Sequence, residues 1–153
     1  MSGNIGKLNA AIYRNLQSIL NSKLKDISIR SGQYDFFYVI SLQEGITQKE
    51  LSEWLYIGKS TTAKVVKNLV DHGYIRKEKD AADKRYERLY LTEKGRQITP
   101  LIHETFLETV ELTTRQLSEQ EVQQTVSLLK KILANVSEEK ERISTESDES
   151  SEL

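Results

Sequence analysis

Residues 47–92 read TQKELSEWLYIGKSTTAKVVKNLVDHGYIRKEKDAADKRYERLYLT. Apolar residues at steps of three and four predict two short helices, and the residues after them alternate as strands do. Helix, turn, helix and hairpin, in that order, describe a winged helix-turn-helix. This arrangement fits a positively charged helix into a groove of DNA. The stretch therefore predicts DNA binding.

The first helix of this stretch begins at a capping box. Thr47 can accept the amide of Glu50, and the Glu50 carboxylate can accept the amide of Thr47. The helix runs through Leu55, and we expect the turn after it at Gly58, where glycine can take a positive φ. A second helix is predicted over Lys59–Asp71.

The hairpin, or wing, is predicted from strands over residues 74–79 and 87–91. Leu89 and Leu91 share one face of the second strand, because side chains alternate along a strand. The polar residues 80–86 suit the tip of a hairpin.

Amphipathic helices flank this module on both sides. The sequence predicts helices over residues 5–24, 34–44, 92–113 and 118–136, the last opened by a second capping box, Ser118 to Glu121. The fold class is therefore mainly α with a small β-hairpin wing. The predicted segments are an N-terminal dimerisation helix (1–30), the winged helix-turn-helix (31–92), C-terminal dimerisation helices (93–137) and an acidic, disordered tail (138–153).

The charge of the chain is unevenly distributed. The 153 residues have a net charge of −1. Residues 138–153 hold seven acidic and two basic residues, so residues 1–137 keep the other 20 basic and 16 acidic residues, a net of +4. The segment from Gly58 to Arg88 is also +4, with nine basic and five acidic residues. A basic body suits a nucleic acid partner.

Several functional classes are disfavoured. The chain has no cysteine, which excludes disulfides, thiolate zinc sites and thiol switches. His72 and His103 have no ligand cluster at metal spacing, so no metal and no cofactor are expected. No nucleophile–base pair or phosphate-binding glycine loop indicates an enzyme. No apolar run reaches the roughly 18 residues of a membrane span and no signal peptide is evident, so we expect a cytoplasmic protein.

The helix over Lys59–Asp71 has one apolar face and one face suited to a DNA groove. Small hydroxyl residues permit close approach, and lysines neutralise phosphates or reach guanine acceptors. A solvated helix face is the alternative for such a pattern alone. The predicted DNA-binding residues of this helix are Lys59, Ser60, Thr61, Lys64, Lys67 and Asn68.

The wing carries Lys84 and Arg85 at its tip and Arg88 on the strand that follows. An arginine on a thin hairpin can enter a narrow minor groove, where the negative potential is strongest. We expect these three residues to contact DNA and Asp83 to brace the loop. A solvated hairpin without DNA contacts is the alternative.

The wing sequence also resembles one family. Asp83-Lys84-Arg85, followed after three residues by Leu89-Tyr90-Leu91-Thr92-Glu93-Lys94-Gly95, fits the D-x-R-x-x-x-[LV]-x-L-T-x-x-G signature of the MarR family of regulators. The upstream T-x-x-E-L-S-x-x-L-x-I-x-K-S-T-T and G-Y-I-x-K match it too. The resemblance covers about residues 5–137. Many members have arginine at the position of Lys64, and lysine cannot make the same two-bond fork to guanine.

This resemblance implies a homodimer whose winged modules bind a pseudo-palindromic, inverted-repeat operator in double-stranded DNA. Ser60, Thr61, Lys64 and Lys67 would face the major groove, and Arg85 the minor groove. Relatives often bind small phenolic effectors beside the dimer helices. The candidate lining residues are Tyr13, Tyr34, Phe37 and Tyr38, although aromatic residues at helical spacing are more often core residues.

The leading hypothesis is thus a sequence-specific transcriptional regulator, most often a repressor in such a family. Architectural or nonspecific DNA binding, or a winged helix used for protein contacts, is the alternative. The acidic tail either repels DNA or competes with it for the basic face, or it only solvates the terminus.

Overall fold

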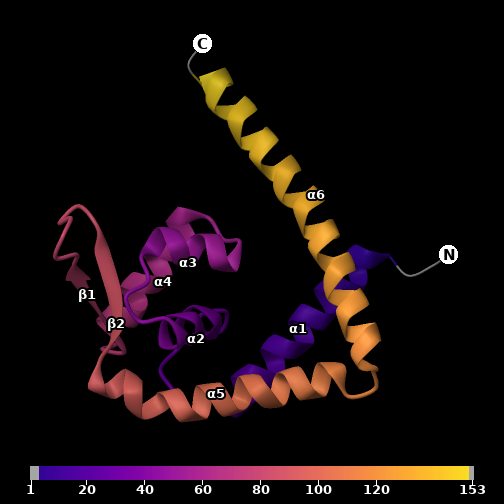
Figure 1. Cartoon of the computed structure of the whole chain (residues 1–153), viewed down its shortest axis with the longest axis horizontal. Coiled ribbons are helices and arrows are strands. Elements are labelled where there is room, and N and C mark those ends of the chain that lie inside the picture. The colour runs from indigo at the N-terminus through magenta and orange to yellow at the C-terminus, as the bar shows by residue number, and fades with distance from the viewer. Residues whose placement is uncertain (1–3, 152–153) are drawn as a thin grey trace. The chain divides into compact units, whose positions relative to one another are not determined.

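The computed structural model describes residues 4–151, and these divide into two compact units between Thr109 and Val110. Figure 1 shows the order of the elements. They are α1 (Ile5–Lys23), α2 (Tyr34–Leu42), α3 (Gln48–Leu55), α4 (Lys59–Asp71), β1 (Ile75–Lys79), β2 (Glu87–Leu91), α5 (Glu93–Thr114) and α6 (Glu119–Ser151).

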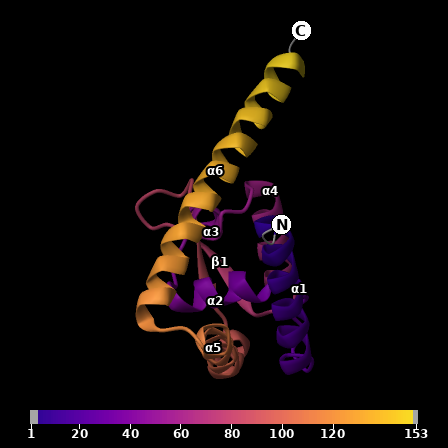
Figure 2. The same ribbon diagram turned by 90° about the vertical axis from the view of Figure 1, so that its right-hand side faces the viewer.

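The first unit is built around one hydrophobic core. Helices α2, α3 and α4 pack against one another and against the hairpin of β1 and β2, whose loop extends away from the helices in both views (Figures 1 and 2). Burial of apolar side chains from every one of these elements stabilises the module. Fully buried members of this core include Phe36, Phe37, Ile40, Leu51, Val66, Leu69, Leu89 and Ile102.

The two strands form the predicted antiparallel hairpin. Ile75 pairs with Leu91, and Lys79 pairs with Glu87 at the far end. Leu89 and Leu91 are both buried, which confirms that they share the core-facing side of β2. On β1 only Ile75 is buried and the other four positions are exposed. The hairpin is therefore anchored at its base and solvated toward its tip.

Both predicted capping boxes are present. At α3, the Thr47 amide donates to the Glu50 carboxylate at 2.9 Å and the Glu50 amide donates to the Thr47 hydroxyl at 3.2 Å. The same exchange joins Ser118 and Glu121 ahead of α6, at 2.7 and 3.2 Å. Each box satisfies two amides that the first turn of a helix leaves unpaired.

The turn between α3 and α4 differs from the prediction. Gly58 has φ −65°, a value open to any residue, whereas Tyr56 has φ 54° and takes the left-handed conformation. Tyr56 ends α3, and its amide donates to carbonyls of the last turn of that helix. Gly58 instead begins α4, with its carbonyl accepting the Thr62 amide at 3.1 Å. The positive φ was predicted at the wrong residue because the helix end, rather than glycine, determines where the chain reverses.

The start of α5 is packed tightly against the hairpin. The Thr92 hydroxyl accepts the Gly95 amide at 3.1 Å, which confirms Thr92 as the cap of this helix. A Cβ added to Gly95 would lie 2.2 Å from the Tyr74 carbonyl oxygen. Ile102, two turns later, is fully buried. The predicted segment boundary at residue 92 is therefore a change of secondary structure inside one packed unit.

The last helix is longer than predicted. We expected it to end near Val136 and the acidic tail to be disordered, but α6 continues to Ser151. No glycine or proline interrupts residues 119–151, and Arg142 bridges Glu139 and Glu146 one turn to either side. These pairs support the part of α6 beyond Val136, which has no apolar stripe. Residues 152 and 153, at the end of the predicted tail, and residues 1–3, at the start of the predicted N-terminal segment, lie outside the described residues.

Across residues 4–151, none of the helices has an apolar stretch long enough to cross a membrane.

Candidate nucleic-acid interface

Helix α4 has the two faces that the sequence predicts. Its buried positions are Thr62, Val65, Val66 and Leu69. On the other side, the predicted DNA-binding residues Lys59, Ser60, Thr61, Lys64 and Lys67 are exposed, and Asn68 is half-buried at the margin.

The buried face of α4 includes Thr62, whose hydroxyl pairs with the Ser52 hydroxyl of α3. The Ser52 hydroxyl of α3 donates to the Thr62 hydroxyl at 2.8 Å, and Thr62 donates to the Gly58 carbonyl at 3.1 Å. A buried hydroxyl without a partner is costly, so the pair favours one spacing of the two helices. The pair holds the first turn of α4, which carries Ser60 and Thr61, against α3.

A lysine of α5, Lys94, contacts the C-terminal end of α4. The Lys94 ammonium donates to the His72 carbonyl at 2.7 Å and lies 4.3 Å from the centre of the Tyr74 ring. A cation at this end complements the helix dipole. Within α4, Lys67 pairs with Asp71 at 2.7 Å, with 74% of the lysine side chain still exposed. The charge of Lys67 is thus partly compensated, and its ammonium stays accessible.

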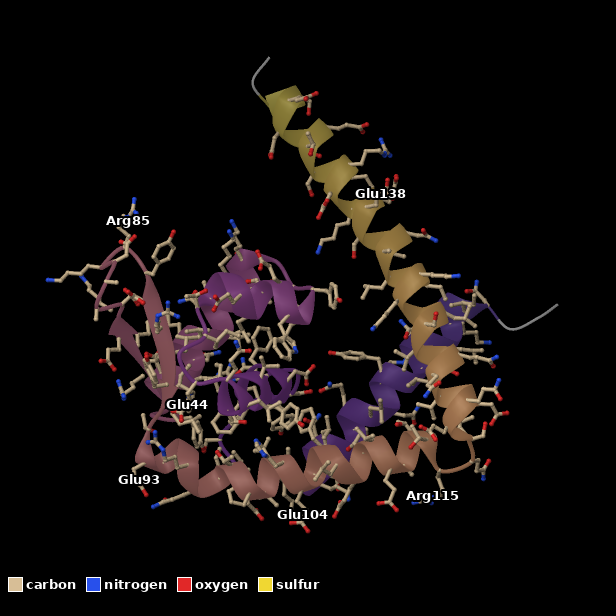
Figure 3. All side chains as sticks on the ribbon, viewed as in Figure 1. Glu44, Arg85, Glu93, Glu104, Arg115 and Glu138 are labelled. Atoms are coloured by element: carbon tan, nitrogen blue, oxygen red, sulfur yellow. The ribbon has the colours of Figure 1, made fainter. Side chains whose placement is uncertain are left out.

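The wing places Arg85 at its tip, as Figure 3 shows. The Arg85 side chain is 84% exposed, and its guanidinium lies along the Asp83 carboxylate, with Nε–Oδ1 at 3.0 Å and Nη2–Oδ2 at 2.7 Å. Asp83 also accepts the Arg85 amide at 3.1 Å. The hydrogen bond from Arg85 lowers the pKa of Asp83. The brace expected of Asp83 is present in this geometry, and Lys84 beside it is exposed.

Arg88 is placed differently from the other predicted contacts. Its side chain is 39% exposed and bridges the Asp80 carboxylate and the Gly45 carbonyl, the latter at 2.8 Å. The hydrogen bond from Arg88 is the main reason that the pKa of Asp80 is lowered to about 2. The sequence reasoning did not single out Asp80, because a pairing eight residues apart becomes visible only from the hairpin register.

A second polar contact holds the base of the hairpin. One oxygen of Glu44 accepts the Leu91 amide at 2.8 Å and the Arg96 guanidinium at 3.2 Å. Glu44 lies beside the base of β2 in Figure 3. These bonds join the end of α2, strand β2 and the start of α5.

A groove of about 680 Å³ lies between the first turn of α3 and β2. Its basic lining residues include Arg85 and two lysines outside the predicted set, Lys49 and Lys77. Lys77 faces Glu87 at 3.9 Å, so the groove carries both signs of charge. Lys77 is the lysine of the G-Y-I-x-K match but was not among the predicted contacts, and Lys49 occupies a variable position of the upstream match, so neither was predicted to contact DNA.

The four aromatic residues predicted to line an effector site are placed unequally. Tyr34 and Phe37 lie in the hydrophobic core, the position that the alternative interpretation gave them, and burial raises the pKa of Tyr34. Tyr13 is 56% exposed. Tyr38 is half-buried and stacks on Phe106 with ring centres 4.4 Å apart.

Tyr38 also belongs to a small polar cluster. Its ring meets the His103 ring edge-on at 5.2 Å, and the His103 Nε2 atom lies 2.7 Å from the Ser41 hydroxyl. Among residues 4–151, no group of three histidine or acidic side chains is arranged to hold a metal ion.

The chain is similar in sequence to known proteins. The model of the MarR family matches residues 25–85. An uncharacterised helix-turn-helix-type transcriptional regulator, YybA of Bacillus subtilis, is 30% identical over 125 residues, which span 82% of this chain and 83% of the relative.

Solved structures agree over most of the chain. A MarR protein from Peptoclostridium difficile has a TM-score of 0.79 at 32% identity, covering 91% of each chain. A regulator from Listeria monocytogenes, complexed with a 26-mer DNA, has a TM-score of 0.80 at 29% identity, covering 90% of this chain and 91% of that one.

Proposed function

Because the chain belongs to the MarR family of transcriptional regulators, we propose that it is a sequence-specific repressor that binds a pseudo-palindromic operator as a homodimer. The observation that carries this proposal is the outward face of α4, where Ser60, Thr61 and Lys64 are exposed over a buried apolar face. Hydroxyls and lysines on a helix without bulky neighbours suit the major groove. The similar Listeria regulator complexed with DNA supports the same partner for this chain.

The wing supplies the second contact of the proposal. Arg85 enters the minor groove beside the major groove that α4 reads, and Lys84 contacts the backbone. Asp83 holds two of the guanidinium nitrogens and so fixes the direction in which the arginine leaves the loop. Arginine suits this role, since the narrow minor groove attracts its charge.

The dimer is supported by apolar side chains that the single chain leaves in solvent. Ile5, Leu8 and Ile12 on α1 are between 55% and 58% exposed and recur at helical spacing. Within the second unit, Val126 and Leu129 of α6 are 45% and 47% exposed. A second copy of the chain is the partner that covers these faces, and twofold symmetry matches an inverted repeat. Sedimentation equilibrium of the full chain tests this: a monomer at micromolar concentration would contradict the proposal.

The repressor binds a small phenolic anion that alters its affinity for DNA. The half-buried Tyr38, with His103 and Ser41 beside it, supports a polar aromatic contact for such a ligand. The test is the affinity for operator DNA with and without hydroxybenzoate, with Tyr38→Ala as the variant that loses the response. An affinity that hydroxybenzoate leaves unchanged argues against this ligand class.

Selection of binding sites from random duplexes tests the sequence specificity. We expect enrichment of an inverted repeat with half-site centres roughly 10 base pairs apart, or a multiple of that spacing. Enrichment of no common sequence, with binding that depends only on salt, would favour architectural coating of DNA instead. Repression itself is tested by placing the selected repeat before a reporter promoter in cells with and without the protein.

A further inference from the structure

Arg88 lies where two separate segments of the module meet. Its Nε donates to the Asp80 carboxylate, at the start of the wing loop, and its Nη1 donates to the Gly45 carbonyl at 2.8 Å, in the turn between α2 and α3. Only 15% of the Asp80 side chain is exposed. A charge-assisted pair of this kind, partly shielded from water, is stronger than a fully exposed ion pair.

The Asp80 carboxylate also organises the loop that leads to Arg85. Its second oxygen accepts the amides of Ala82 and Asp83 at 2.8 and 2.9 Å. The Asp80 amide in turn donates to the Tyr86 carbonyl at 2.9 Å and closes the loop. One carboxylate therefore connects Arg88 to the backbone of the wing tip.

The Gly45 end of the bridge is joined to β2 and to α3. The Gly45 amide donates to the Leu89 carbonyl at 2.7 Å, and the Leu89 amide donates to the Ile46 carbonyl at 2.9 Å. The backbone of Thr47, which caps α3, forms an isolated antiparallel β-bridge with the backbone of Arg88. Movement of the wing relative to the α2–α3 turn would break these bonds together.

We propose that Arg88 is a positioning residue, which clamps the wing loop through Asp80 to the α2–α3 turn and so fixes Arg85 relative to the reading face of α4. Arg88 does not contact DNA itself. The clamp rests on the proposed DNA-binding function and reassigns a residue that the sequence alone placed among the DNA contacts. The Nε and Nη1 atoms of Arg88 already donate to Asp80 and Gly45, while Arg85 and Lys84 at the tip are exposed.

The clamp and a direct phosphate contact predict opposite effects of Asp80→Ala. If Arg88 contacts phosphate, removing the acid frees the arginine and adds positive charge, so DNA binds more tightly. If Arg88 is a clamp, removing the acid releases the loop and operator binding weakens. Salt dependence separates them as well, because each lost phosphate contact lowers the salt slope by about one.

The experiment measures affinities of the full chain for the selected inverted repeat and for a random duplex over a range of salt. We expect Arg88→Ala and Asp80→Ala each to weaken operator binding about tenfold, within the range that one base or groove contact supplies. The double variant should be no weaker than either single one, since both break the same clamp. The salt slope should stay unchanged. Glu78→Ala is the matched control, because Glu78 is an exposed acid on β1 that pairs with Arg76, and it should not weaken binding.

Two further measurements separate the clamp from loss of folding. Arg88→Lys keeps the positive charge but cannot donate to both partners in the same plane, so the clamp predicts the tenfold loss and a phosphate contact predicts near-normal binding. Trypsin should cleave after Lys84 and Arg85 faster in both clamp variants than in Glu78→Ala, without any DNA present. A far-ultraviolet circular dichroism spectrum like that of the parent protein shows that each variant is folded.

Tighter binding by Asp80→Ala, a salt slope reduced in Arg88→Ala, or full affinity in Arg88→Lys would overturn the clamp while leaving the proposed function standing. A parent protein that binds the selected repeat and the random duplex equally would overturn the proposed function and the clamp with it.

Discussion

Helix α4 and the wing carry the two proposed sets of DNA contacts, and they are held in place by different forces. Behind the outward residues of α4 lie buried Val65, Val66 and Leu69. Behind Arg85 at the wing tip lie charged and hydrogen-bonded groups, with Asp80 and Asp83 as the acceptors. Apolar burial depends little on salt or pH, whereas ionic contacts depend on both. The position of α4 should therefore depend little on salt and pH, whereas the position of the wing tip should depend on both.

The largest effect is expected from weakening the apolar support of α4. Leu69 is 1% exposed, and Leu69→Ala should lower the free energy of unfolding by about 3 kcal/mol through lost burial and the cavity left behind. Urea denaturation at low and high salt measures this loss, and we expect it to be the same at both. A loss that shrinks markedly at high salt would break the distinction between the two regions.

The second prediction concerns Gly95, where α5 meets the turn that joins the two regions. Gly95→Ala places a Cβ 2.2 Å from the Tyr74 carbonyl oxygen if the backbone stays where it is. The backbone must therefore move, and we expect the free energy of unfolding to fall by about 2 kcal/mol. Gly58→Ala is the matched control, because a Cβ there meets nothing within 4 Å and its φ is ordinary. Thermal unfolding should separate the two, and equal midpoints would refute the close-contact explanation.

A smaller effect should follow from the Ser52–Thr62 hydroxyl pair between α3 and α4. Thr62→Val leaves the buried Ser52 hydroxyl without its acceptor and should cost about 1–2 kcal/mol. Combining it with Ser52→Ala removes both partners, so the double variant should recover part of that loss. Chemical denaturation of the parent protein, the two single variants and the double variant measures the coupling free energy between the two hydroxyls. Strictly additive losses would show that the two hydroxyls do not act together.

The pH dependence of the wing gives the smallest effect. The folded pKa of Asp80 is about 2, below its ordinary value of 3.8, so the unfolded state binds more protons between these values. The stabilisation by Asp80 is therefore complete above about pH 4 and is lost as pH falls through about 2. The free energies of unfolding of the parent protein and Asp80→Asn, measured by denaturation, should differ by a constant amount near neutral pH. The two free energies of unfolding should converge in acid. A difference that disappears already near pH 6 would show that a group other than Asp80 causes it.

Most of the fold can be predicted from the sequence because its signals are local. The bounds of α4, the two strands and both capping boxes follow from periodicity and from residues three apart. The structure confirms them, with the first strand beginning one residue later than predicted, at Ile75. The exposed residues of α4 follow in the same way from helical spacing.

What the sequence did not predict depends on contacts between distant segments. Arg88 meets Gly45 across 43 residues, and Thr62 meets Ser52 on another helix. Neither contact leaves a periodic pattern. The extension of α6 lies outside the prediction for another reason, because residues 138–151 lack the apolar stripe that indicates an amphipathic helix.

Base preference on the selected repeat, measured for Lys64→Ala and Arg85→Ala, tests most directly whether the helix and the wing read different parts of one operator. We expect both variants to lose about 1–3 kcal/mol of binding. Lys64→Ala should relax preference only at base pairs within the major groove of each half-site, and Arg85→Ala only at the flanking minor-groove positions. Loss of preference at the same positions in both variants, or unchanged binding by Arg85→Ala, would contradict a reader with two separate contacts.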